Sequence, residues 1–331
     1  MDAVHVVGAG GIGCAVGHAL CAAGVAVTFV DADPQKVTAG REYGVAIHLR
    51  TFQRATFVHF PEWAPPRGMP VLLCTKCYDN AAVLARLPDD ADLIPIQNGF
   101  DPALQGRPPH VEGIASFVSE CRRHEPITRI TRGGKLHLGP SDGTAGTGLR
   151  ERAAALAARL RRAPFRALVV EDIRPYKYTK LMYNAAISPL AAAAGLDNGD
   201  LLRLPRARHL FFDLLRENYA ILSGAGVPLG KVGPLHPTKV AAVLRRPWLA
   251  RALAWAFYPS LRGTYCSMAG DLPGRTEIDN YNGHLLALAG DRPCPLNRRV
   301  YDLVRRMERE HISPHPSVLD ELLAAGAAVS V

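Results

Sequence analysis

The stretch AVHVVGAGGIGCAVGHALCAAGVAVTFVDAD, residues 3–33, decides the fold of the first half of the chain. An apolar strand leads into a glycine-rich turn, an alanine-rich helix follows, and a second apolar strand ends at an acidic residue. Gly8, Gly10 and Gly13 form the pattern G-x-G-x-x-G where the first strand ends. Free backbone N–H groups at the start of a helix bind phosphate, so this order of elements predicts a dinucleotide-binding βαβ unit.

The expected cofactor contacts of this turn are Gly8, Ala9, Gly10, Gly11, Ile12 and Gly13. A tight turn in some other α/β protein is the alternative interpretation of the glycines. Asp31 ends the second strand, where a carboxylate binds the ribose hydroxyls of NAD and repels the 2′-phosphate of NADP. We therefore predict NAD(H) in preference to NADP(H), although Lys36 is near enough in sequence to restore some phosphate binding.

The alternation of strand and helix continues beyond this unit. PVLLCTK (70–76) and ADLIPIQNG (91–99) are typical of buried strands, with a helix in NAAVLARL (80–87) between them. Further strands, some of them antiparallel, are expected between about residue 108 and Glu171. We therefore predict a doubly wound parallel α/β sheet of Rossmann type in residues 1–171.

From residue 172 to residue 331 the apolar residues follow a helical period, which predicts an all-α second domain. Six helices are expected in YKYTKLMYNAAISPLAAAAG, LFFDLLRENYAILSGAG, PTKVAAVLRR, RTEIDNYNGHLLALAG, LNRRVYDLVRRMERE and SVLDELLAA. Gly195, Gly226 and Gly290 stand where helix ends are expected.

Composition narrows the class of protein. The chain has 331 residues, 48% of them hydrophobic, and a formal net charge of +9 that comes mostly from arginine. No helix-turn-helix, zinc-finger spacing or basic stripe with aromatics is present, so the positive charge favours anionic small molecules over nucleic acid. Seven scattered cysteines and the lack of a basic secretory segment predict a reducing cytoplasm. The apolar run from Val4 to Val30 is too rich in glycine for a membrane span.

Seven short motifs occur in a fixed order: GAGGIG, TKCYDN, IQNG, KLMYNAAISPL, NGDL, SM and TEIDNYNG. In this order they resemble the ketopantoate reductase (2-dehydropantoate 2-reductase) family nearly end to end. The resemblance implies a Rossmann domain joined to a helical domain of the 6-phosphogluconate dehydrogenase C-terminal type, with the active site in the cleft between them. It also implies reduction of the ketone of a 2-oxo acid by a nicotinamide hydride, and a homodimer is one expected assembly.

Lys180 and Asn184 lie four residues apart in a predicted helix and therefore project from the same face. The resemblance implies that Lys180 is the general acid, which donates a proton to the substrate carbonyl as hydride reaches the carbon. A positioned ammonium also stabilises the developing alkoxide. The alternative is a lysine that extends from the helix to solvent.

The resemblance also assigns substrate contacts. Asn184 and Asn198 match substrate-binding asparagines, and Ser267 matches a serine that binds the substrate carboxylate. Ser188 stands where the family typically has another asparagine, so contacts there are expected to differ. A turn residue before Gly199 is the alternative interpretation of Asn198.

Three further residues complete the expected site. Glu277 matches an acid that meets the bound ligands and keeps the ammonium of Lys180 charged. Lys76 matches a lysine near the cofactor, and Asn98 matches a residue that bridges nicotinamide and substrate, with an Asn-Gly turn as its alternative. Cys74 and Cys77 form a C-x-x-C, but without a second such pair or a histidine cluster we expect no metal.

Two points leave the substrate open. The tryptophan-containing stretch at about 245–262 is expected to be helical core, with a substrate-pocket wall or a dimer face as the alternative. The same chemistry on a different oxo or hydroxy substrate in a specialised pathway, or a non-catalytic protein that senses dinucleotide, also remains open.

Overall fold

The computed structural model describes residues 1–331 except 66, 108–109, 144–145, 247, 250–262 and 328–331. Contacts divide the chain into two compact units, Met1–Arg174 and Pro175–Val331. The boundary therefore lies three residues beyond the expected end of the first domain at Glu171.

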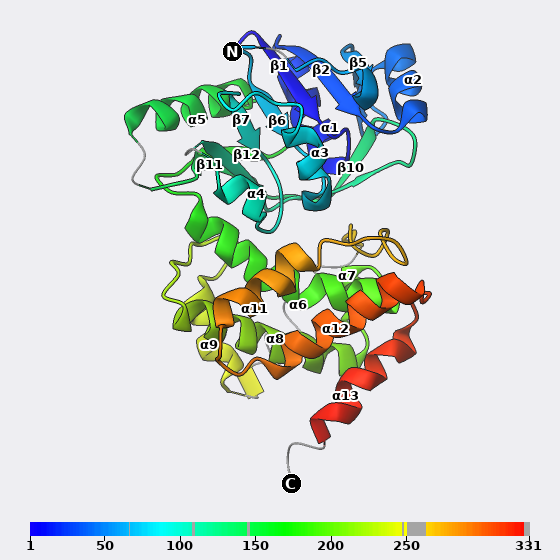
Figure 1. Ribbon diagram of the computed structural model, residues 1–331, viewed down its shortest axis with the longest axis vertical. Coiled ribbons are helices and arrows are strands. Elements are labelled where there is room, and N and C mark those ends of the chain that lie inside the picture. Colours follow the sequence, from blue (N-terminus) through cyan, green and yellow to red (C-terminus); the bar gives the residue numbers. More distant parts are fainter. Residues whose placement is uncertain (66, 108–109, 144–145, 247, 250–262, 328–331) are drawn as a thin grey trace. The chain divides into compact units, whose positions relative to one another are not determined.

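A parallel sheet of five strands forms the centre of the first unit (Figure 1). Its order is β5-β2-β1-β6-β7, so the chain begins in the middle strand and adds strands on both sides. The strands are β1 (Ala3–Val7), β2 (Ala26–Asp31), β5 (Thr56–His59), β6 (Val71–Leu73) and β7 (Leu93–Pro95). The helices between them include α1 (Gly11–Ala22), α2 (Pro34–Tyr43) and α3 (Asn80–Leu84), and α4 (Pro102–Gln105) follows β7. The predicted Rossmann-type architecture is confirmed.

Two smaller sheets follow in the same unit, and they were predicted only in part. One has the order β4-β3-β10-β9 and the other β12-β11-β8. Their strands are β3 (Val45–Ile47), β4 (Thr51–Gln53), β8 (Val111–Ala115), β9 (Val118–Cys121), β10 (Ile127–Arg132), β11 (Lys135–Pro140) and β12 (Arg166–Val169). Pairing is antiparallel between β9 and β10 and between β8 and β11, but β12 pairs parallel to β11.

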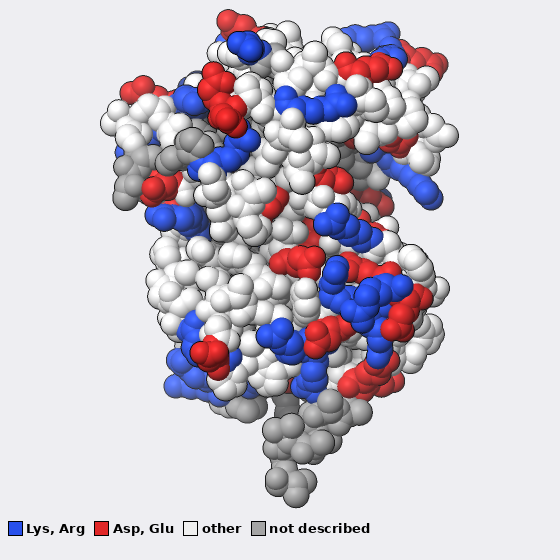
Figure 2. All heavy atoms as spheres, in the orientation of Figure 1, with Lys and Arg blue, Asp and Glu red and all other residues white. Residues whose placement is uncertain are grey.

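Helix α5 (Thr147–Arg159) carries three arginines. It buries Ala153 and Leu156 on one side, while Arg150, Arg152 and Arg159 form ion pairs with Glu171, Asp92 and Asp2. Figure 2 shows acidic and basic side chains interspersed over the face in view. The excess positive charge is therefore partly neutralised locally and forms no single basic stripe on that face.

The described part of the second unit is helical and contains no strand, which confirms the all-α prediction for those residues. Its elements are α6 (Arg174–Ala194), α7 (Asn198–Leu201), α8 (Pro205–Gly224), α9 (Pro237–Leu244), η3 (Asp279–Gly283), α11 (His284–Ala289), α12 (Pro295–Glu310), η4 (Pro316–Leu319) and α13 (Asp320–Ala327). Gly195, Gly226 and Gly290 each have positive φ at a helix end, as expected.

The predicted start of one helix is wrong. The helical pattern from Arg275 to Gly290 begins only at Asp279, and its first turn, η3, is a π-helix. Most of the tryptophan-containing stretch, residues 250–262, lies outside the described residues. Within the described ranges, no helix is both long enough and apolar enough to cross a membrane.

Candidate active site

The glycine-rich turn is shaped by close contacts that only glycine allows. Gly8 has φ of +95°, and its N–H donates to the carbonyl of Val30 at 2.8 Å. A Cβ on Gly13 would lie 2.0 Å from the Gly8 oxygen, so Gly13 lets helix α1 approach β1 closely. A Cβ on Gly10 would meet no atom within 4 Å. The space beside Gly10 is thus open, as it must be where a pyrophosphate approaches the backbone.

Asp31 connects the end of β2 to this turn. One of its carboxylate oxygens accepts the N–H of Ala9 at 2.7 Å and the other accepts the N–H of Asp33 at 2.9 Å. The N–H of Ala9, one of the predicted cofactor contacts, is therefore already bonded to Asp31. The first-turn N–H groups of α1, at Gly11, Ile12 and Gly13, are the ones that have no acceptor within the helix.

Lys36 lies on α2 with its ammonium 4.0 Å from the carboxylate of Asp31. Burial alone would lower the pKa of Lys36, but the negative charges around it, led by Asp31, raise the pKa above its ordinary value. The pair places a fixed negative charge and a fixed positive charge side by side at the end of β2. This arrangement bears directly on discrimination between a ribose hydroxyl and a ribose phosphate.

Two cysteines that the sequence did not single out support the same turn. The thiol of Cys14 donates to the carbonyl of Ala9 at 3.1 Å, and that of Cys121 donates to it at 3.5 Å. Both the N–H and the carbonyl of Ala9 are therefore held by side chains from other elements.

A polar network joins the motifs that contain Lys76 and Asn98. The amide of Gln97 donates to the hydroxyl of Thr75 at 3.1 Å and to the side chain of Asn80 at 2.7 Å, and the amide of Asn80 donates back to Gln97 at 3.1 Å. No local pattern indicated this network, because its members follow β6, open α3 and follow β7. It brings the turns that carry Lys76 and Asn98 together.

The two cysteines next to Lys76 have separate structural roles. Cys77 donates its thiol hydrogen to the carbonyl of Asn98 at 3.1 Å, which links the two motifs again. Burial raises the pKa of Cys74 to about 12, so its thiol stays protonated and unreactive at neutral pH. Among the described residues no group of histidine, cysteine and acidic side chains is arranged to hold a metal.

In the second unit, α6 presents a half-buried row of polar side chains. Lys180, Asn184 and Ser188 are spaced one turn apart and are all partly exposed, whereas Met182 and Ala185 on the opposite side are buried. The predicted placement of Lys180 and Asn184 on one face of one helix is thus what α6 shows. Lys180 as a whole residue is therefore neither buried nor fully exposed.

Asn198 is held close to the end of this row by the segment 264–266. Its N–H donates to the carbonyl of Thr264 at 3.3 Å, and its amide donates to the carbonyl of Tyr265 at 3.2 Å. The thiol of Cys266 then donates to the carbonyl of Ser188 at 3.7 Å. These contacts bring Asn198 and Ser188 together, while Ser267, the next residue along, is exposed in a turn.

Two of the predicted ligand-binding asparagines have a buried oxygen without a hydrogen-bond donor among the described residues. These atoms are the side-chain Oδ1 of Asn98 in the first unit and that of Asn198 in the second. Because buried acceptors in proteins are nearly always bonded, each of these atoms is available to a donor from outside the protein.

Glu277 is 3% exposed and accepts a hydrogen bond from the hydroxyl of Tyr281 at 3.4 Å. The segment that carries it is tied to α6, because the amide of Asn282 donates to the carbonyl of Ala185 at 3.0 Å. The segment from Glu277 to Asn282 thus packs against the helix that bears Lys180. The expected pairing of the Glu277 carboxylate with the ammonium of Lys180 stays a prediction.

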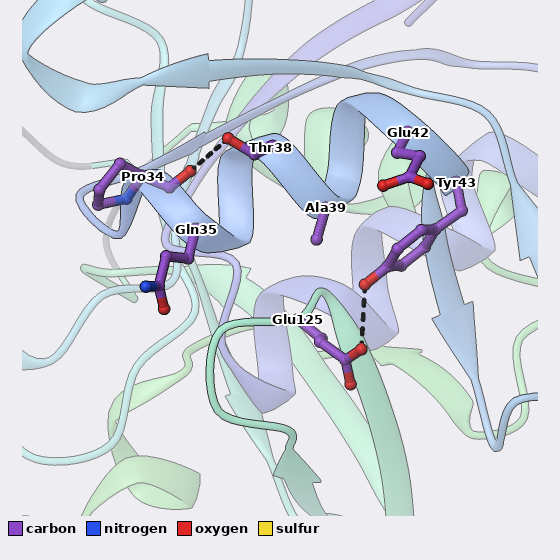
Figure 3. A pocket seen from close by; sticks show the side chains of 7 residues that line it. All are labelled: Pro34, Gln35, Thr38, Ala39, Glu42, Tyr43 and Glu125. Carbon is purple, nitrogen blue, oxygen red and sulfur yellow. Dashed lines mark hydrogen bonds between the residues drawn. The ribbon is translucent and has the colours of Figure 1, made fainter.

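A groove of about 440 Å³ lies along α2 and contains none of the predicted site residues. Figure 3 shows Glu42 and Tyr43 on α2 across from Glu125, with the tyrosine hydroxyl bonded to Glu125 at 3.2 Å. Its charged lining side chains are both carboxylates, so it repels an anionic substrate. The glycine turn and the α6 row are the better candidates.

Comparison with known proteins assigns the chain to a family. Residues 4–142 match the family described as "Ketopantoate reductase PanE/ApbA", and residues 172–308 match its C-terminal part, "Ketopantoate reductase PanE/ApbA C terminal". The chain belongs to the ketopantoate reductase family. Members of this family are oxidoreductases that act on a ketone or CH–OH group, and the resemblance inferred from the seven motifs is confirmed.

Two relatives from the ketopantoate reductase family share about a quarter of their residues with this chain. The 2-dehydropantoate 2-reductase of Halobacterium salinarum is 26% identical over 325 residues, which cover 93% of this chain and 99% of the relative. A PanE/ApbA family ketopantoate reductase from Ralstonia eutropha has a similar structure, with a TM-score of 0.73, 25% identity, and coverage of 93% of this chain and 99% of its own.

A D-mandelate dehydrogenase solved with NADH and anilino(oxo)acetate has a TM-score of 0.75 at 18% identity, and the match covers 93% of this chain and 99% of the dehydrogenase. At that identity the likeness shows the fold alone.

Proposed function

We propose that this protein reduces a small 2-oxo acid to the 2-hydroxy acid with a nicotinamide dinucleotide, and that Lys180 is the general acid. The row of Lys180, Asn184 and Ser188 on one half-buried face of α6 carries the proposal. This row lies in the segment that matches the C-terminal part of the ketopantoate reductase family.

The reduced nicotinamide would supply the hydride that reaches the ketone carbon. As the carbonyl oxygen gains negative charge, Lys180 donates a proton to it and its ammonium stabilises the charge that develops. Proton donation by a positioned side chain typically accounts for about 10²- to 10⁴-fold in rate. Glu277 keeps Lys180 protonated, because a nearby carboxylate offsets the burial that would lower the pKa of a lysine.

The substrate contacts that we propose are amides and hydroxyls. Asn184 and Asn198 donate to the oxo acid and Ser267 binds its carboxylate, with Ser188 at the far end of the α6 row. The buried Oδ1 of Asn198 suits a hydroxyl donor, such as the 2-hydroxyl that reduction creates in the product.

The residues of the glycine turn fit a dinucleotide. The open space beside Gly10 and the first-turn N–H groups of α1 suit a pyrophosphate. Asp31 suits the ribose hydroxyls, so we propose NAD(H) over NADP(H). Lys76 and Asn98, held by the Thr75–Asn80–Gln97 network, would then contact the nicotinamide end.

A panel of 2-oxo acids, followed through NADH and NADPH absorbance, tests the function. We expect Lys180→Ala to lower kcat by about 10²- to 10⁴-fold while NADH still binds. Lys239→Ala, an exposed lysine on α9, is the matched control and should behave like the parent protein. A parent protein that binds NADH but turns over no oxo acid would support a dinucleotide sensor and refute the reductase.

A further inference from the structure

Helix α6 contains a proline at position 189, well inside its bounds of Arg174 and Ala194. Proline has no N–H, so the carbonyl four residues earlier, that of Ala185, loses its helical partner. Ala185 is fully buried, and a buried carbonyl without a donor costs about 1–3 kcal/mol. A donor from another element must therefore be supplied.

Asn282 supplies that donor. Its amide nitrogen donates one hydrogen to the carbonyl of Ala185 at 3.0 Å and the other to the Oδ1 of Asn297 at 2.9 Å. Asn282 is fully buried and belongs to the π-helical turn Asp279–Gly283. The bond to Ala185 thus comes from a π-helical turn. Such turns are rare in proteins, and many of those that occur lie at functional sites.

The chain of bonds returns to α6. Asn297 donates its amide to the Oδ1 of Asn218 at 2.8 Å, and Asn218 donates to the carbonyl of Met182 at 2.9 Å. All three asparagines, which we call the asparagine chain, are fully buried. The members of the asparagine chain lie on α8, α12 and η3. Through Asn218 and Asn282 the chain donates hydrogen bonds to two carbonyls of α6 that are three residues apart.

These two carbonyls bracket Asn184 and lie within two turns of Lys180. Glu308 holds the segment that leads into Asn282, since its carboxylate accepts both the N–H and the hydroxyl of Thr276 at 2.7 Å. Thr276 precedes Glu277 directly. Side chains from other helices thus bond the backbone of α6 on both sides of Asn184 and the backbone of Thr276, next to Glu277.

We propose that Asn282 is a positioning residue of the reductase, whose amide replaces the N–H that Pro189 lacks and so fixes the turn of α6 that carries Asn184 and Lys180. The inference rests on the proposed function of Lys180. Positioning matters because a misplacement of about 1 Å costs about 100-fold in rate. Without the amide, the free carbonyl of Ala185 would turn toward another donor and rotate the turn that contains Asn184.

The test uses Pro189→Ala, which restores an N–H four residues after Ala185. In the parent background, we expect Asn282→Ala to lower kcat at least about tenfold. The KM for the nicotinamide cofactor should stay unchanged, because the glycine turn that binds it lies in the other unit. In the Pro189→Ala background the same substitution should lower kcat no more than about threefold, since the new N–H bonds the carbonyl of Ala185.

If Asn282 served only in packing, Pro189→Ala would not restore the kcat that Asn282→Ala loses. If Asn282→Ala costs the same kcat in both backgrounds, or raises only the KM for cofactor, the positioning role is refuted. If Asn282→Ala fails to fold but the double variant folds, kcat of the double variant decides: a value within about threefold of that of Pro189→Ala supports the positioning role, and a larger loss refutes it. If both fail to fold, Asn282 serves packing and the proposal is refuted.

Urea unfolding of the parent, the two single variants and the double variant tests the same bond without measuring activity. We expect Asn282→Ala to lower the unfolding midpoint more in the parent than in the Pro189→Ala background. Equal shifts in both backgrounds would refute the bond as a substitute for the missing N–H. Absence of turnover in the parent on every oxo acid would refute the proposed function, and the unfolding cycle would still decide the role of the bond.

Discussion

Cofactor choice is the property on which the structure makes its most quantitative prediction. Asp31 and the ammonium of Lys36 lie 4.0 Å apart, and both side chains are 14% exposed. At an effective dielectric constant of about 20, two unit charges about 4 Å apart interact by about 4 kcal/mol. A phosphate with about −1.5 to −2 charges next to Asp31 is repelled by more than this. Lys36 on its other side attracts it.

We expect the two charges not to cancel, because the ribose hydroxyls of a bound cofactor would meet the carboxylate of Asp31 itself and Lys36 would lie farther from them. After this offset and screening by solvent, we expect a net preference for NADH of about 2 kcal/mol, or about 30-fold in kcat/KM. Asp31→Asn removes the repulsion and keeps Lys36, so it should reverse the preference to favour NADPH by about tenfold. Lys36→Met should increase the preference for NADH by about tenfold instead.

The assay compares kcat/KM for NADH and NADPH in the parent, Asp31→Asn, Lys36→Met and the double variant. Dissociation constants for both cofactors, measured by fluorescence without substrate, make the comparison independent of turnover. Because Asp31 also holds the N–H groups of Ala9 and Asp33, thermal unfolding of each variant is the control for damage to the turn. A parent that prefers NADPH, or an unchanged ratio in Asp31→Asn, would contradict the charge argument.

Two further predictions concern the glycine turn and the stability of the first unit. Gly13→Ala would place a Cβ 2.0 Å from the Gly8 oxygen and should lower the melting temperature measured by calorimetry. Gly10→Ala, whose Cβ meets no atom within 4 Å, should leave the melting temperature unchanged and weaken NADH binding measured by titration. A lower melting temperature for Gly10→Ala than for Gly13→Ala, or unchanged NADH binding by Gly10→Ala, would contradict the assignment. Burial lowers the pKa of His137 to about 4, so the unfolded chain binds its proton first and stability should fall as pH drops from about 6.5 to about 4. His137→Gln should flatten that slope by up to about 1.4 kcal/mol per pH unit in urea titrations, and an unchanged slope would show that other groups carry it.

Much of the fold could be predicted from local patterns. The G-x-G-x-x-G turn, the helix ends at Gly195 and Gly226 and the amphipathic α6 all depend on neighbours in sequence. Their backbone conformations follow from residues a few positions away, so pattern and conformation agree. The strands β3 to β5 were missed because each is short and has polar residues within or beside it, whereas the equally short β6 and β7 lie in continuous apolar runs.

The sequence by itself determined the Rossmann-type half, the helical half and the residue types of the candidate site. Only the tertiary structure decided three hydrogen-bonded contacts. Asp31 accepts the N–H of Ala9, Gln97 bonds both Thr75 and Asn80, and Asn282 donates to the carbonyl of Ala185, 97 residues away. These bonds depend on which buried polar groups the packing brings together. Each such group must find a donor or acceptor once water is excluded, and a local pattern does not specify a partner far along the chain.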